Sequence, residues 1–248
     1  MNKATLPKTF GIKNRYLIVK DLWPGTSCDI KLAEDTQEKK LVTLKIFNKG
    51  HVQEVLNNCK MMKKLEHPNV LKVLEFGKIQ ISQAFNGNSE RVDQFYAIEE
   101  HAANSNLLEK VQTSEGVSEM VGRFLFKQML EGVQSCHFKG ICHRSLSLKS
   151  FLLDSNFNVK LRKFSNAKSF REDGVISGQC GEKHCQPPEM QAGILYQGKE
   201  VDIFQLGVCL FQMITGVRPF ENALPEDKYY KCIAANRQDI FFDKHLKD

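Results

Sequence analysis

Cysteine and histidine residues gather at two places in this 248-residue sequence. They lie within positions 136–143 and 180–185, and they are Cys136, His137, Cys142, His143, Cys180, His184 and Cys185. Thiolate and imidazole groups are the usual zinc ligands, and structural zinc sites hold them in close pairs such as Cys-x-x-Cys. Neither cluster contains that spacing, so we predict no metal site. The eight cysteines are scattered, which favours reduced thiols over a disulfide framework.

The composition is that of an ordinary soluble globular protein. Apolar side chains make up 42% of the sequence and charged ones 26%, which excludes collagen-like, coiled-coil and wholly disordered chains. A chain of this length buries roughly 70–75% of the surface that its unfolded form exposes. The longest charge-free apolar stretch, residues 203–215, is shorter than the roughly 20 residues that span a bilayer. We therefore expect a buried helix there and no membrane contact.

The net charge of +6 is spread along the chain, with no stripe of arginines and aromatic residues. Such a pattern favours a solvated basic surface over a nucleic-acid partner. Residues 1–20 hold five basic residues and no acid. They lack an apolar segment, and Pro7 and Gly11 interrupt any amphipathic helix, so we interpret residues 1–15 as a basic lead rather than a transit peptide. The expected location is cytoplasmic.

The first part of the chain is rich in strand signals. Alternating and β-branched residues predict five strands, at residues 16–22, 29–33, 41–47, 70–76 and 94–99. Apolar spacing predicts one helix at residues 52–65, which ends at His67-Pro68-Asn69 because the residue before a proline is driven out of the helical region. A polar loop around Asn86-Gly87-Asn88 is expected between the last two strands.

Helical periodicity dominates the second part. One amphipathic helix is predicted at residues 118–137 and ends at Lys139-Gly140, where the glycine is a typical cap. Its apolar flank is expected to contain Val121, Phe124, Leu125, Phe126, Met129, Leu130 and Val133. A second helix, at residues 201–214, is apolar nearly all round and is predicted to lie at the centre. The small and polar residues 103–106 are the expected linker.

This order of elements and motifs resembles a eukaryotic serine/threonine protein kinase domain, most of all the calcium/calmodulin-dependent kinases. The matching motifs are His67-Pro68-Asn69-Val70, Cys142-His143-Arg144, Phe151-Leu152-Leu153-Asp154, Pro187-Pro188-Glu189, residues 201–207 and residues 215–220. The resemblance implies an α+β, two-lobed protein kinase-like fold. A small five-stranded β lobe with one helix is expected at residues 16–102, and a larger, mainly α lobe at residues 103–248. The pattern stops before the last helices of that family, so we expect a C-terminally truncated lobe.

The resemblance implies a vestigial nucleotide cleft. In kinases a glycine-rich loop lets the backbone approach the phosphates of ATP, and of its three glycines only Gly25 remains here. Lys45 corresponds to the lysine that binds the α- and β-phosphates, and Ile30 and Leu152 correspond to the apolar faces of the adenine site. Thr43 brings a hydroxyl to a position that is normally a small alanine.

Two further positions change the charge around Lys45. Asn58 stands where active kinases have the helix glutamate that pairs with this lysine, so that ion pair is not expected; a replacement by Glu54 would need a shift of the helix. Glu99 falls at the end of the fifth strand, at the rear of the pocket. A buried carboxylate there requires a partner or a proton, and the candidate partners are Lys45 and Lys163.

The resemblance also implies a degenerate catalytic loop. Ser145 stands at the position of the catalytic aspartate, and a hydroxyl cannot act as a base at pH 7 without another base beside it. Ser147 replaces the lysine that steadies the transferred phosphoryl group, whereas Ser150 and Lys163 replace the two magnesium ligands. Losing a general base costs roughly 10²–10⁴ in rate. We therefore expect no catalytic residue, no metal and no phosphotransfer by the usual route.

The scaffold of the fold is expected to survive these changes. The resemblance implies a hydrophobic stack that is anchored on Asp202 and comprises Val73, Met62, Phe164 and His143. For Arg144 three roles stay open, namely a phosphate site, a site for an acidic partner group, or a structural hydrogen bond.

The leading interpretation is a catalytically inactive protein kinase domain, a pseudokinase, that serves without a cofactor as a binding or structural subunit of a larger assembly. In the family the counterpart of Glu189 pairs with an arginine beyond the end of this pattern. We expect either another cation for Glu189 or a protein partner that covers it together with Ile240, Phe241 and Phe242. A cytoskeletal complex would suit such a subunit.

Two alternatives retain a nucleotide. One is a switch that binds ATP without turnover. The other is an unconventional ATP-dependent serine/threonine kinase or nucleotidyl transferase, in which Lys45 and Lys163 clamp the phosphates without a metal. In that case nucleotide binding would survive a chelator.

Overall fold

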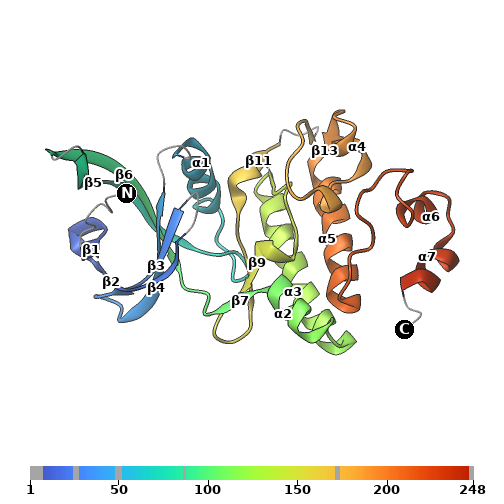
Figure 1. The fold of residues 1–248 in the computed structure, drawn as a ribbon, viewed down its shortest axis with the longest axis horizontal. Helices are drawn as coiled ribbons and strands as arrows, with labels where there is room; N and C mark the ends of the chain where they lie inside the picture. Colours follow the sequence, from blue (N-terminus) through green and yellow to red (C-terminus); the bar gives the residue numbers. More distant parts are fainter. Residues whose placement is uncertain (1–7, 25–27, 48–51, 86–87, 171–173, 246–248) are drawn as a thin grey trace. The chain divides into compact units, whose positions relative to one another are not determined.

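The computed structural model describes residues 8–24, 28–47, 52–85, 88–170 and 174–245 (Figure 1). The chain divides into two compact units. Unit 1 comprises Met1–Lys63 and Leu71–Ala102, and unit 2 comprises Lys64–Val70 and Ala103–Asp248. Unit 1 is built on a sheet and unit 2 mainly on helices, which makes the chain an α+β protein. No helix in the described ranges is both long and apolar enough to cross a membrane.

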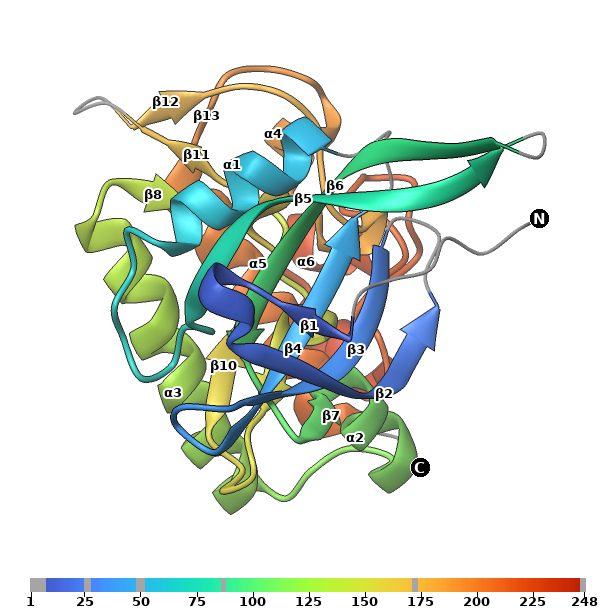
Figure 2. The same ribbon diagram turned by 90° about the vertical axis from the view of Figure 1, so that its left-hand side faces the viewer.

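Unit 1 holds an antiparallel sheet in the order β1-β2-β3-β4-β6-β5 (Figure 2). The strands are β1 (Thr9–Phe10), β2 (Tyr16–Pro24), β3 (Cys28–Asp35), β4 (Lys40–Phe47), β5 (Val73–Phe85) and β6 (Asn88–Glu100), and a 3₁₀ turn, η1 (Ile12–Asn14), follows β1. The prediction of five strands is therefore wrong by one, because the two residues of β1 are too few to show alternation. The five predicted strands correspond to β2–β6.

The last two strands are longer than the sequence predicted. β5 starts at Val73 and pairs with β6 until Phe85 lies opposite Asn88, so strand pairing replaces most of the expected polar loop. Residues 86–87 of that loop lie outside the described residues. Helix α1 (Val52–Met62) is shorter than the predicted 52–65.

The two faces of this sheet have different surroundings. One face carries the core cluster of Phe10, Tyr16, Ala33, Val42, Leu44, Ile46, Tyr96 and Ile98. The other is covered by α1, whose Val55 and Cys59 pack with Phe47 of β4. Successive residues of a strand point to opposite faces, so Thr43 and Lys45 lie on the same face as Phe47, the face on which α1 packs.

Unit 2 is mainly helical. Its helices are α2 (Leu107–Ser114), α3 (Glu119–Phe138), α4 (Pro188–Gln191), α5 (Gly198–Thr215), α6 (Tyr230–Ala234) and α7 (Gln238–His245), with 3₁₀ turns η3 (Leu148–Ser150), η4 (Phe164–Asn166) and η5 (Lys183–Cys185). Short strands form three small sheets: β7 (Asn104–Asn106) with β9 (Phe151–Leu153) and β10 (Val159–Leu161), β8 (Ile141–Cys142) with β11 (Lys168–Ser169), and β12 (Val175–Ile176) with β13 (Tyr196–Gln197). The predicted linker at residues 103–106 is thus corrected to a strand, because β7 pairs with β9.

Helix α3 confirms the predicted element but corrects its buried flank. It ends at Lys139, and Gly140 follows with a φ of 68°, the left-handed conformation that favours glycine after a helix. Val121, Phe124 and Leu130 are exposed, at 45%, 55% and 40%. The buried residues are Gly122, Leu125, Gln128, Met129, Gly132, Val133 and Cys136.

Candidate functional site

The surviving lysine of the expected nucleotide cleft is held by a carboxylate of the same sheet. Lys45 Nζ lies 2.5 Å from Glu99 Oε2, and the two side chains are only 14% and 2% exposed. Lys45 of β4 lies opposite Ala97 of β6, and Glu99 lies opposite Thr43, so the pair is formed diagonally across neighbouring strands. Of the two partners predicted for Glu99, Lys45 is confirmed. The ammonium is therefore neutralised from within unit 1.

Helix α1 packs close to this ion pair, but none of its described side chains forms an ion pair with Lys45 or Glu99. Burial raises the pKa of the Cys59 thiol to about 12; the Glu99 carboxylate contributes to this rise, and Lys45 opposes it. Asn58 is half-buried, and its Oδ1 has no hydrogen-bond partner among the residues that the structure describes. The Asn58 amide therefore does not replace the missing glutamate as a partner of Lys45. The side chain of Glu54 lies outside the described residues.

The hydroxyl predicted beside the adenine position has its own partner. Thr43 Oγ1 lies 3.1 Å from Nδ1 of His101. Burial lowers the pKa of His101, and Lys20 lowers it further, so the imidazole is neutral at pH 7. His101 is not predicted as a partner of Thr43, because nothing in the sequence spacing connects it with β4. Ile30 lies on β3 opposite Lys45, and Gly25 lies outside the described residues.

In unit 2 a single carboxylate holds the loop that follows β8. Asp202 of α5 is fully buried, and it accepts the backbone N–H groups of His143 at 2.8 Å and Arg144 at 2.7 Å. His137 Nε2 lies 2.8 Å from the same carboxylate. The ring of His143 packs edge-on against Phe164, with 4.9 Å between centroids. The predicted anchor on Asp202 is therefore confirmed for the residues that belong to unit 2.

The serines of this loop make structural hydrogen bonds. The Ser150 hydroxyl, 1% exposed, donates to the Ser145 carbonyl at 2.9 Å and accepts from the Ser147 N–H at 3.3 Å. The Ser147 hydroxyl donates to Glu182 at 2.9 Å, and the Lys149 ammonium donates to the other oxygen of Glu182 at 3.1 Å. The side chains of Ser147 and Ser150 thus bind the backbone of their own loop and the carboxylate of Glu182.

Glu182 is the residue of this site that sequence reasoning missed. Burial alone would raise the pKa of its carboxyl, but the Ser147 hydroxyl and the Lys149 ammonium together hold that pKa below its usual value. Gly181 precedes it with a φ of 82°, and a Cβ there would lie 3.1 Å from Ser145 Oγ. Among the described residues, the Ser145 hydroxyl makes no hydrogen bond to a carboxylate or an imidazole.

The guanidinium of Arg144 makes structural hydrogen bonds within the fold. The residue is 4% exposed, and its guanidinium donates to the Tyr196 hydroxyl at 2.9 Å. It also donates to three backbone carbonyls, those of Asn166 at 3.1 Å, Ser177 at 2.9 Å and Gly178 at 2.7 Å. Of the three predicted roles, the structural hydrogen bond is the one that the contacts support.

The residues at the two metal positions do not fit a magnesium ion. Hard divalent cations take oxygen ligands, above all carboxylates. The Ser150 hydroxyl is engaged on both sides, and Lys163 is a cation that stands in the left-handed conformation before η4. In the described ranges no group of three or more histidine, cysteine, aspartate or glutamate side chains is arranged to hold a metal.

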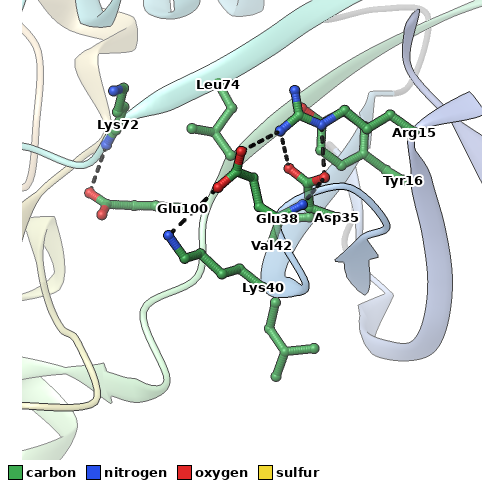
Figure 3. Close-up of a pocket in the computed structure, with 10 residues that line it drawn as sticks. Arg15, Tyr16, Asp35, Glu38, Lys40, Val42, Lys72, Leu74 and Glu100 are labelled. Atoms are coloured by element: carbon green, nitrogen blue, oxygen red, sulfur yellow. Dashed lines mark hydrogen bonds and ion pairs between the residues drawn. The ribbon is translucent and has the colours of Figure 1, made fainter. Parts of the chain in front are cut away.

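Unit 1 contains a further candidate site that rests on geometry alone. A pocket of about 440 Å³ in unit 1 is lined by Arg15, Tyr16, Asp35, Glu38, Lys40, Leu41, Val42, Lys72, Leu74 and Glu100 (Figure 3). Arg15 binds both oxygens of Asp35, at 2.7 and 2.5 Å, and holds the pKa of that carboxyl below its usual range. Lys40 lies 3.9 Å from Glu38. Several of the charged residues that line this pocket therefore neutralise one another.

The expected partner surface near residue 241 is largely covered by the chain itself. Phe241 is 4% exposed and packs against Phe211 and His245, and Ile240 is half-buried. Only Phe242, at 47%, is exposed. The burial of Phe241 thus contradicts an exposed cluster of all three side chains, whereas a protein partner over this region stays a prediction.

The protein kinase domain family matches residues 16–246 of the sequence, so the chain belongs to that family. This confirms the predicted α+β, two-lobed protein kinase-like fold. The chain is 29% identical to CBL-interacting protein kinase 11 of Oryza sativa subsp. japonica over 247 residues, which cover 96% of the chain and 47% of the relative.

Two further relatives are at the same level of identity. CBL-interacting serine/threonine-protein kinase 17 of Arabidopsis thaliana is 29% identical over 84% of the chain and 48% of its own length. NUAK family SNF1-like kinase 1 of Mus musculus is 29% identical over 85% of the chain and 31% of its own length. The chain thus spans less than half of the length of these relatives.

Proposed function

We propose that this protein kinase domain is catalytically inactive and acts as a binding or structural subunit. The observation that carries the proposal is Ser145. At the position where the family has its catalytic base stands a hydroxyl that makes no hydrogen bond to a carboxylate or an imidazole in the described part of the chain. A hydroxyl without a base cannot take the proton of a substrate at pH 7.

The rest of the loop supports the same proposal. Ser147 and Ser150 have their hydroxyls engaged by Glu182 and by the loop backbone, so neither is available to a phosphoryl group or a metal. In unit 1, Glu99 already neutralises the Lys45 ammonium, so a phosphate could use only the N–H donors of Lys45 that Glu99 leaves unused. The binding partner would be another protein, and Phe242 is the exposed apolar residue that a partner would cover near residue 241.

A phosphotransfer assay tests the proposal directly. The full chain, with magnesium and labelled ATP, is expected to give no phosphorylated product, either on itself or on a basic protein substrate. Lys45→Met and the matched variant Lys40→Met, at the exposed start of the same strand, are expected to behave alike. Product formation that Lys45→Met abolishes and Lys40→Met preserves would overturn the proposal.

The second candidate function retains a nucleotide, and the similarity to kinases that are named as serine/threonine-specific favours it. Lys45 is preserved and its ammonium has three donors, so ATP binding, with or without turnover, is compatible with the Lys45–Glu99 pair. A thermal-shift measurement with ATP, with and without EDTA, separates the cases. A shift without product indicates a switch, a shift with product indicates an unconventional kinase, and the absence of any shift supports a binding subunit that uses no nucleotide.

A further inference from the structure

The hairpin of β5 and β6 continues beyond the rest of its sheet. The two strands pair along their whole length, from Val73 opposite Glu99 to Phe85 opposite Asn88. β4 pairs only with residues 95–100 of β6. Residues 79–85 and 88–94 therefore form a ribbon whose strands pair only with each other in the described structure, and both figures show it running on past β4 (Figures 1 and 2).

The outer edge of β5 is a free sheet edge. β5 stands last in the strand order, so its outer N–H and C=O groups have no neighbouring strand among the described residues. Proteins usually protect such edges with charged residues, prolines or bulges, or by keeping the edge strand short. The opposite edge of this sheet follows that rule, because β1 has only two residues. β5 has 13 residues.

The sequence of the projecting part of β5 carries none of these protections. Residues 79–85 read Ile-Gln-Ile-Ser-Gln-Ala-Phe and contain no charge, no proline and no glycine. A run of six or seven residues with these properties is the pattern typical of strands that pair between chains. The other strand of the ribbon differs, since residues 88–94 contain Glu90, Arg91 and Asp93. The two edges of one hairpin are therefore chemically unequal.

We propose that the β5 edge is a self-association surface, on which a second copy of this chain adds its own β5 in antiparallel orientation. A two-fold axis near Ser82 places residues 79–85 of one copy opposite the same residues of the other. This register places uncharged residues opposite uncharged residues, so no like charges lie at opposite positions. A charged partner strand would find no complementary charge on this segment, so the segment favours its own copy. The inference holds whether or not the chain transfers phosphate.

The first test compares two variants, each of which adds one charge to one strand of the hairpin. Light scattering of the full chain is expected to show a concentration-dependent dimer. In Ser82→Lys the axis brings two ammonium groups opposite each other, so the dimer dissociation constant is expected to rise at least tenfold. Ser89→Lys adds the same charge to the β6 strand of the same hairpin and is expected to leave association unchanged. Circular dichroism confirms that both variants are folded.

The second test gives a positive signal that misfolding cannot produce. Ser82→Lys and Ser82→Glu are each expected to be monomeric alone, but their mixture is expected to dimerise, because opposite charges now face each other across the axis. A chain that is monomeric at every concentration overturns the proposal. So does a mixture that stays monomeric, or a Ser89→Lys variant that dissociates as readily as Ser82→Lys.

Discussion

The ion pair of unit 1 and the loop of unit 2 differ in how their polar side chains find partners. Both regions hold positions where the kinase resemblance predicted other residues. In unit 1 a buried charge is retained, and a second charge, Glu99, has been placed beside Lys45 to neutralise it. In unit 2 the positions at which the kinase resemblance predicted catalytic groups, 145, 147 and 150, carry hydroxyls, and two of these bind neighbouring groups of the fold.

The difference follows from what each group can bond to. A buried ammonium has donors only, so it must have an anion or several acceptors. A hydroxyl both donates and accepts, so it can close onto a backbone carbonyl and a backbone N–H without any counter-ion. Unit 1 therefore depends on a matched pair of charges, whereas the loop of unit 2 is held by hydrogen bonds to several groups outside it, among them Asp202, Gln205 and Glu182. Substitutions at these residues should show that contrast.

Asp202→Ala is expected to have the largest effect. It removes the acceptor of the His143 and Arg144 N–H groups and the partner of His137, all inside the fold. Removing one partner of a buried charged contact costs about 3–5 kcal/mol, and this case belongs at the upper end because three donors lose their acceptor. Denaturant unfolding measures the loss. If Asp202→Ala unfolds like the exposed control Asp239→Ala, the loop does not depend on this anchor.

The parts of the molecule that the sequence predicted are those with long periodic patterns. Enrichment in β-branched residues at 41–47 indicated β4, which carries Lys45, and helical spacing indicated α3 and α5 to within a few residues. Strands of two or three residues, such as β8 and β11, show no period and were missed.

The flank of α3 was misassigned for a geometric reason. Positions spaced by four residues turn about 40° per step around a helix of 3.6 residues per turn, so Val121 and Val133 lie about 120° apart. Both cannot face one narrow core, and Val121 is exposed. Gln128 is buried instead, because its Oε1 accepts from Asn69 Nδ2 and from the Val159 N–H, each at 2.9 Å. Such a contact between distant segments cannot be read from local spacing.

Glu182 was missed for a similar reason, since its partners lie more than thirty residues away. The partner of Glu99, in contrast, could be predicted, because a buried carboxylate next to a strand lysine has few chemical options. Charge requirements inside a sheet are thus easier to predict than hydrogen bonds that bind one loop to another.

The ion pair of unit 1 is expected to show the second-largest effect, with a signature of its own. Lys45→Met leaves Glu99, 2% exposed, without its counter-ion and should cost about 3 kcal/mol. The double variant Lys45→Met/Glu99→Leu replaces both charges with apolar groups and should lose less stability than Lys45→Met alone. Denaturant unfolding of the single and double variants gives the free energies of unfolding for a double-mutant cycle. Losses that simply add would show that the two side chains are energetically independent.

The smallest expected effect is at Glu182, which accepts from the Ser147 hydroxyl and forms an ion pair with Lys149 of the same loop. The folded-state pKa of this carboxyl lies below its ordinary value of 4.5, so its stabilising contribution is present above that pH and is lost as pH falls through the folded value. Its side chain is 32% exposed and that of Lys149 is 43% exposed, so solvent screening limits the contribution to about 0.5 kcal/mol near pH 7.

Urea midpoints measured from pH 7 down to about pH 3 test this in Glu182→Gln, with the exposed Glu226→Gln as the matched control. The difference in stability between wild type and Glu182→Gln should shrink as the pH falls, because protonation removes from the wild type the charge that the variant already lacks. The control should show no such convergence. A difference that stays constant with pH would mean that the Ser147 hydrogen bond, which glutamine can still accept, is the whole contact, and that this loop is held by neutral groups alone.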